Sequence, residues 1–276
     1  MTIKNNVTID QVLNFSDMAR VTTSYMQNQR HSLVSQKYQP IQAASVGQAL
    51  NEKGFTLVSC MTGKARQEDK ASHQRTIARY RHNDDFEIQG LKLDIIYISK
   101  HMGRGCDEFR LGFYRGVCAN QWAVGTLFAN VRIRHNENAL VAINNGLAEV
   151  LAQRQKLIET IQKMQSIQLN GTQIAELAKK FTEIRLEGKT NIVDTNWESL
   201  ARVHRLEDQK TDLFTVANVL QENIVNAPLQ YRVNSTDASG VSYIRNMTTR
   251  QLKESSTQLV ELNSKMFDAA MELMAA

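Results

Sequence analysis

The hydrophobic period of this sequence changes once, at about residue 135. Before that point, from Phe55 onward, short runs alternate apolar and polar residues between polar or glycine-containing turns, which is typical of antiparallel strands. After it, apolar residues recur at i, i+3 and i+4 from Leu140 to Ile167, which predicts one long helix. Strands followed by helices favour an α+β fold over a parallel βαβ sheet. We therefore predict an antiparallel β-meander over about residues 55–135, packed on a long helix and followed by a helical C-terminal half.

The two ends of the chain differ from this centre. Residues 1–45 hold a polar leader without a clear period, which we interpret as an N-terminal arm that could dock on a neighbouring subunit. Residues 46–226 are predicted to form the α+β core domain, in which Gly54 ends a first short helix. Residues 227–276 are predicted to be a linker around Pro228 and a C-terminal helix.

The composition is ordinary for a globular protein. With 276 residues and 42% hydrophobic residues, the chain is long enough to bury a core. No run approaches the roughly 18 apolar residues of a membrane helix, and the start MTIKNNVTIDQV lacks the pattern of a signal peptide. Three scattered cysteines do not form a disulfide framework. We therefore expect a cytoplasmic protein with no membrane partner.

Positive charge is concentrated in the middle of the sequence. The net charge is +5, and residues 64–135 hold thirteen Lys/Arg against eight Asp/Glu, whereas residues 136–276 hold fifteen against seventeen. A basic excess confined to one segment suggests an anionic partner, most commonly nucleic acid. The alternative is a solvated surface that happens to be basic, and charge alone does not separate the two.

The basic residues of this segment fall where a phosphate could reach them. Arg104 lies between two glycines in a turn that can expose backbone N–H groups, and Arg132 and Arg134 project from one side of a strand. The expected DNA-contacting set is Lys64, Arg66, Arg79, Arg81, Lys100, Arg104, Arg132, Arg134 and His135. Tyr80 and Tyr114 could offer flat faces to bases, and the alternative for both is a half-buried sheet residue.

Arg115 breaks the alternation of its strand. Counting by two places it among apolar residues, and burying an unpaired charge is too costly. Either a bulge at a neighbouring glycine turns it outward, or a carboxylate pairs with it inside. The candidate carboxylates are Asp94, Asp107 and Glu108. Cys118 is interpreted as a small buried residue and Asn120 as the holder of a tight turn, so Arg115, Cys118 and Asn120 are predicted to be structural.

Signatures of catalysis are missing from the sequence. It has no G-x-x-x-x-G-K-[ST] phosphate loop, no H-E-x-x-H, no G-x-S-x-G and no C-x-x-C. His101, Cys106 and Cys118 do not have the spacing of a structural zinc site. We therefore expect a non-catalytic protein without a cofactor or a metal. A metal-dependent nuclease that uses Asp94 or Asp107 is kept as an alternative.

The central stretch resembles a family of unknown function that phages and plasmids carry. The matching residues are SKHMGRG (99–105), FYRGVCANQW (113–122) and VRIRH (131–135), and the resemblance covers roughly residues 45–165. Gln121-Trp122 departs from the family pattern, in which a small residue such as Gly is expected. The resemblance implies a bacteriophage or another mobile genetic element, and hence the host bacterial cytoplasm. It implies no activity.

A second resemblance is to the single-strand annealing proteins of phages, of the RecT/Red-beta type. It rests on size, on a basic antiparallel sheet followed by a long helix, and on a helical C-terminal part, and no short motif carries it. Such proteins grip the DNA backbone and leave the bases free to pair, without ATP. This resemblance implies single-stranded DNA binding and strand annealing in homologous recombination.

The same resemblance implies particular partners. The chain would form a homo-oligomer, either a ring or a filament, and could meet a phage exonuclease or a host single-strand-binding protein. The alternative function is a protein-interaction module that inhibits a host defence system or nuclease, with its basic face against an acidic protein. These two hypotheses differ in whether the purified chain binds DNA.

Overall fold

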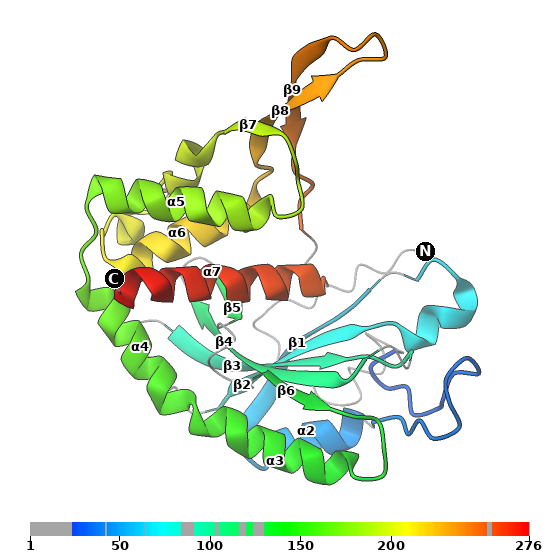
Figure 1. The fold of residues 1–276 in the computed structure, drawn as a ribbon. Coiled ribbons are helices and arrows are strands. Elements are labelled where there is room, and N and C mark those ends of the chain that lie inside the picture. Colours follow the sequence, from blue (N-terminus) through cyan, green and yellow to red (C-terminus); the bar gives the residue numbers. More distant parts are fainter. Residues whose placement is uncertain are drawn as a thin grey trace. The chain divides into compact units, whose positions relative to one another are not determined.

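The computed structural model of the chain describes residues 24–41, 43–63, 65–83, 91–102, 105–115, 120–123, 130–252 and 256–275. The chain divides into two units, namely Met1–Lys156 with Glu254–Thr257, and Leu157–Lys253 with Gln258–Ala276. Figure 1 shows the elements of both units in the colours of the sequence. The domain boundaries expected near residues 45 and 226 stay a prediction, because a division by compactness does not show which part folds alone.

An antiparallel sheet forms the centre of the first unit. Its strands are β1 (Phe55–Thr62), β2 (Thr76–His82), β3 (Leu91–Ser99), β4 (Asp107–Arg115), β5 (Asn120–Ala123) and β6 (Asn130–Ile133). They lie in the order β1-β2-β3-β4-β5, and β6 pairs with the part of β4 that β5 does not reach. From β1 to β5, strands that are consecutive in sequence are neighbours in the sheet. This arrangement confirms the predicted meander.

Helices precede and follow this sheet. α2 (Ala43–Asn51) leads into β1, and Gly54 follows the helix with a positive φ of 79°, as expected for a helix stop. α3 (Ala139–Ala152) comes after β6 and places Gly146 against Val131 of that strand. A Cβ at position 146 would lie 2.5 Å from Cγ1 of Val131, so glycine permits this close approach of helix and strand. The sheet therefore packs on the helix, as predicted.

The long helix predicted from Leu140 to Ile167 is present but interrupted. α3 ends just before Gln153, and α4 (Arg154–Ser166) begins just after it. The Gln153 N–H donates to the Val150 carbonyl at 3.2 Å, which tightens the last turn of α3 into a 3-10 form. Neither Gly nor Pro marks this position, and the apolar period continues through it, so the sequence gives no sign of the interruption.

Helices dominate the second unit, as predicted. They are α5 (Gly171–Arg185), α6 (Leu213–Asn226) and most of α7 (Thr257–Ala275), with the short 3-10 turns η4 (Trp197–Ala201) and η5 (Leu206–Asp208). α6 is buried along nearly its whole length, and its Gln221 donates to Oδ1 of Asn263 in α7 at 3.0 Å. Asn170 caps α5 at its N-terminus. Its side chain accepts the Gln173 N–H at 3.0 Å.

A β-hairpin takes the place of the linker that was expected around Pro228. β8 (Gln230–Thr236) and β9 (Ser242–Thr248) pair along their full length, and β7 (Ile192–Thr195) pairs with the other side of β8. In the turn, Asp237 Oδ1 accepts the Val241 N–H at 2.9 Å, and Gly240 has a φ of 85°. The polar residues that suggested a linker therefore form the turn of a hairpin.

Candidate functional site

Arg132 and Arg134 are exposed at the last strand of the first sheet. Arg132 belongs to β6 and Arg134 follows the end of that strand. Arg66, which precedes the short 3-10 helix η1 (Glu68–His73), is exposed as well. Three of the other predicted residues lie outside the described residues, namely Lys64, Arg104 and Cys118. The backbones of Tyr114, Arg115 and Asn120 belong to β4 and β5, but their side chains lie outside the described part.

Arg79 and Arg81 are turned into the protein, toward Asp94. Arg81 of β2 lies opposite Asp94 of β3, and its Nε and Nη2 donate to Oδ1 and Oδ2 of Asp94 at 2.8 and 3.2 Å. Arg79 Nη1 lies 3.4 Å from Asp94 Oδ2. Asp94 is fully buried and Arg79 is only 4% exposed. Two guanidinium groups on one buried carboxylate thus connect β2 to β3, and Arg79 does not face the solvent.

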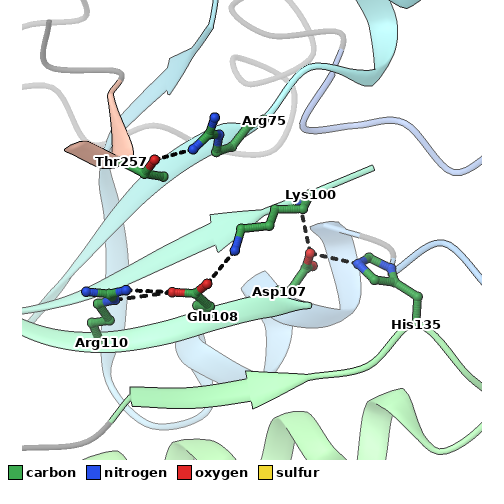
Figure 2. Close-up of polar contacts among 7 residues, drawn as sticks. All are labelled: Arg75, Lys100, Asp107, Glu108, Arg110, His135 and Thr257. Atoms are coloured by element: carbon green, nitrogen blue, oxygen red, sulfur yellow. Dashed lines mark hydrogen bonds and ion pairs between the residues drawn. The ribbon is translucent and has the colours of Figure 1, made fainter. Parts of the chain in front are cut away.

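Lys100, Glu108 and Arg110 form a second charged group (Figure 2). Glu108 and Arg110 lie on the same face of the sheet as Arg79. The Lys100 ammonium donates to Oε1 of Glu108, and Nη2 of Arg110 donates to its Oε2 at 2.8 Å. In the sheet register, Arg132 of β6 lies directly opposite Glu108. Three cations therefore gather around a single carboxylate; we call Lys100, Glu108, Arg110 and Arg132 the basic edge.

The carboxyl group of Glu108 is ionised in this arrangement. Burial by itself would raise the pKa of Glu108, but the hydrogen bonds from Lys100 and Arg110 and their positive charges outweigh burial and lower it below its ordinary value. At neutral pH the basic edge thus carries three positive charges and one negative charge. An excess of positive charge that includes the exposed Arg132 attracts anions.

Asp107 is the centre of a buried polar network on the opposite face. Its Oδ1 accepts the backbone N–H of Lys100 at 2.7 Å and lies 2.9 Å from Nε2 of His135 (Figure 2). Its Oδ2 accepts the hydroxyl proton of Tyr97. Tyr38 stacks on His135 with 4.4 Å between the ring centroids. The network fastens the end of β6 to the turn between β3 and β4, and His135 would have to leave it in order to make the expected DNA contact.

Two further buried rings do not face the solvent. His101 is 2% exposed, and neither of its ring nitrogens has a hydrogen-bond partner in the described part of the chain. Burial lowers the pKa of His101 to about 4, so the ring is neutral at pH 7. Tyr80, which was expected to stack on bases, is 1% exposed, and its hydroxyl contacts that of Tyr25. Its position agrees with the alternative interpretation as a sheet residue.

Two features of the site were not predicted from the sequence, namely the role of Arg110 and the contact of Asp107 with His135. The alternation of β4 was sufficient to place Arg110 on the face of Glu108, since the two residues are two positions apart. No comparable signal joins Asp107 to His135. They meet because β6 returns to β4 after β5, and that pairing is not visible in any local pattern.

No three His, Cys, Asp or Glu side chains among the described residues gather in a way that could hold a metal ion. No helix in the described ranges combines the length and the apolar character needed to cross a membrane.

These observations define an α+β protein, in which an antiparallel sheet with a basic edge is followed by an interrupted long helix and a mostly helical half with a small second sheet. The chain belongs to the DUF932 family, a domain of unknown function, whose model matches residues 30–264. Membership in a family of unknown function was expected from the central motifs. The match extends well beyond residues 45–165, over which the resemblance was expected.

Two proteins of Escherichia coli (strain K12) are similar to the chain over most of its length. UPF0380 protein YfjQ and UPF0380 protein YafZ are each 27% identical to it over 230 residues, which cover 83% of this chain and 82% of theirs. No solved structure matches the chain significantly. None of these matches supports the resemblance to proteins of the RecT/Red-beta type, and the family description assigns no activity.

Proposed function

We propose that the chain is a phage- or plasmid-encoded DNA-binding protein that holds single strands at the basic edge of its first sheet. The observation that carries the proposal is the gathering of Lys100, Arg110 and Arg132 around the single carboxylate of Glu108, with Arg134 exposed just beyond. A local excess of cations at a sheet edge attracts the phosphates of a nucleic acid.

The finer proposal is ATP-independent strand annealing in homologous recombination. Contacts to phosphates position a strand without reading its sequence and leave its bases free to pair. Arg132 and Arg134 are suited to such contacts, because guanidinium groups match the geometry of phosphate. A ring or filament of subunits would place basic edges in a row. A phage exonuclease or a host single-strand-binding protein would then be a natural partner.

The placement of the acidic residues favours this proposal over the nuclease alternative. Asp94 and Asp107 are both fully buried. The carboxylate of Asp94 is hydrogen-bonded to two guanidinium groups. That of Asp107 is hydrogen-bonded to a tyrosine, a histidine and a backbone N–H. A carboxylate that binds a catalytic metal must keep coordination sites open to it. We therefore propose no catalytic role for either residue.

The salt dependence of DNA binding tests the proposal. Fluorescence anisotropy of a labelled single-stranded oligonucleotide is titrated with the purified chain over a series of salt concentrations. The double variant Arg132→Gln/Arg134→Gln should bind more weakly, and the slope of log K against log salt should fall by about 1.4, because each lost phosphate contact removes about 0.7.

A matched control removes two cations from the other unit. Arg202 and Lys210 are exposed there, and Arg202→Gln/Lys210→Gln should leave the slope unchanged. Equal effects of both double variants would mean that net charge, and not the basic edge, governs binding. Absence of DNA binding at low salt would contradict the proposal. Affinity for an acidic host protein would then favour the alternative function, a protein-interaction module. Annealing is measured separately with complementary oligonucleotides and without ATP.

A further inference from the structure

Strand β9 is an open edge of the small sheet in the second unit. In the order β7-β8-β9, no described strand pairs with its outer side. Every residue from Ser242 to Asn246 is exposed, so both faces of this stretch lie in solvent. Figure 1 shows the hairpin of β8 and β9 projecting beyond α5 and α6 of the same unit. An edge of this kind offers a row of backbone N–H and C=O groups to another strand.

Most of the usual protections of an edge strand are missing from β9, whose one charged residue is Arg245. The sequence SYIRNMT contains no Pro, no Lys and no acidic residue, and its pairing with β8 has no bulge over seven residues. Three apolar side chains on or next to it are strongly exposed, namely Val241 (61%), Tyr243 (46%) and Ile244 (56%). By contrast, β7 at the other edge is short and its register shifts. β9 is thus the edge of this sheet that is suited to pairing.

The hydrogen bonds of the hairpin fix which residues of β9 point outward. Asp237 N–H donates to the Val241 carbonyl, and Thr249 N–H donates to the Leu229 carbonyl, so odd-numbered residues of β9 bond toward β8. Bonding alternates along an antiparallel strand, and the even-numbered residues therefore direct their N–H and C=O groups to the open side. Within the fully exposed stretch from Ser242 to Asn246, these outward residues are Ser242, Ile244 and Asn246.

We propose that the occupant of this edge is β9 of a second copy of the chain, paired antiparallel about a twofold axis at Ile244. The outward residues then meet one another, because Ile244 pairs with its own copy and Ser242 pairs with Asn246 of the second copy. The three hydrogen-bonded pairs supply about six backbone hydrogen bonds. The two small sheets become one continuous sheet of six strands.

Side chains select this register among those that the backbone allows. Centring the pairing on Ile244 places Tyr243 opposite Arg245 of the second copy, in a non-hydrogen-bonded pair where side chains approach closely. A guanidinium group against a tyrosine ring is a favourable contact. Centring the pairing on Arg245 would instead oppose two arginines, which is destabilising. The strand is thus complementary to itself in one register.

The charge of the hairpin favours a second copy of the chain over DNA at this edge. From Gln230 to Thr248 the hairpin has two arginines, Arg232 and Arg245, and Arg232 is ion-paired with Asp194 of β7. This leaves little of the cation density that a phosphate backbone requires. The inference does not rest on the proposed DNA binding, and it adds a twofold contact that closes on two copies.

Sedimentation velocity over a roughly hundredfold range of concentration tests the pairing, because a single strand contact is small and its dimer depends on concentration. The unmodified chain should move from monomer to dimer. Ile244→Lys should raise the dissociation constant of the dimer by about tenfold or more, since two ammonium groups then meet at the axis. The control Val203→Lys changes an exposed apolar residue elsewhere in the same unit and should leave the dimer unchanged.

Cross-linking then tests the register. Ile244→Cys should form a disulfide with its own copy under mild oxidation, because hydrogen-bonded partners lie about 5.5 Å apart between Cα atoms. Val241→Cys is similarly exposed but would be six residues from the same position on the second copy, roughly 20 Å away, and should not cross-link above the background of the unmodified chain. The two variants carry the same new thiol on the same hairpin, so a difference between them reports the register.

Three results would overturn the inference. A chain that stays monomeric at every concentration has no such contact. A dimer that survives Ile244→Lys, or that cross-links equally at positions 241 and 244, uses another surface or register. If the unmodified chain stays monomeric and Ile244→Lys strengthens DNA binding more than Val203→Lys does, the hairpin contacts DNA and not a second copy. Unchanged DNA anisotropy together with a lost dimer supports the pairing and leaves the proposed DNA interface untouched.

Discussion

Removing the carboxylate of Asp94 is the sharpest test of how the first sheet holds its charges. In Asp94→Ala, Arg81 loses two hydrogen bonds of 2.8 and 3.2 Å, and Arg79 loses a contact of 3.4 Å. Asp94 is fully buried, and the side chains of Arg79 and Arg81 are only 5% and 12% exposed. The variant therefore leaves two guanidinium groups inside the protein without the carboxylate that neutralises them.

The expected loss of stability is large. Breaking a buried ion pair by removing one partner costs about 3–5 kcal/mol, because the other charge stays buried. Arg79 and Arg81 make further interactions within the protein, so we expect the lower end of this range, about 3 kcal/mol. With an m-value of about 2 kcal/mol per molar urea, the unfolding midpoint should fall by roughly 1.5 M.

Urea unfolding, monitored by tryptophan fluorescence, measures this loss of stability in the first unit of the chain, which contains Asp94. The chain has two tryptophans, Trp122 in β5 of the first unit and Trp197 in the second, so a Trp197→Phe background reports the first unit. Asp194→Ala is the control, because its carboxylate holds Arg232 at the surface, and it should leave the midpoint unchanged. An Asp94→Ala midpoint equal to that of the background would refute the buried ion pair.

Two further predictions concern a buried histidine and a helix cap. The pKa of His101 falls from 6.5 to about 4 in the folded protein through burial, so stability should decline by roughly 3 kcal/mol as pH falls from about 6.5 to about 4. Urea midpoints of His101→Leu should lack this part of the decline, and an unchanged pH profile would contradict it. Asn170→Ala should destabilise α5 by about 1 kcal/mol in thermal unfolding, whereas Thr172→Ala should not.

The strands and helices could be predicted wherever a hydrophobic period was long enough to be read. The alternation before residue 135 and the helical period after it give the correct class and the correct order of β1 to β4. The hairpin of β8 and β9 was missed because its residues are mostly exposed, so alternation between apolar and polar residues is weak there. The interruption at Gln153 was missed because it breaks the backbone hydrogen bonding and not the apolar period.

The candidate site was predicted in part, since alternation shows which side chains share a face but not which partners meet them. Arg79 and Arg81 were correctly placed together on β2. Their partner Asp94 is thirteen or more residues away on the next strand, and only the register of β2 against β3 brings it opposite. Asp107 and His135 meet in the same way across β4 and β6. Such pairs depend on register, which local sequence patterns do not specify.

Position within the sheet explains why these arginines divide into buried and exposed ones. β2 lies between β1 and β3, and the charged side chain of Arg79 on this inner strand is covered and neutralised by a carboxylate. Among the described strands, β6 pairs only with β4, so Arg132 on this outer strand remains exposed although it lies opposite Glu108. An inner strand must neutralise a charge, because desolvating it unpaired is too costly, whereas an outer strand can leave it to water or to a phosphate. Contacts to an anion should therefore concentrate on β6.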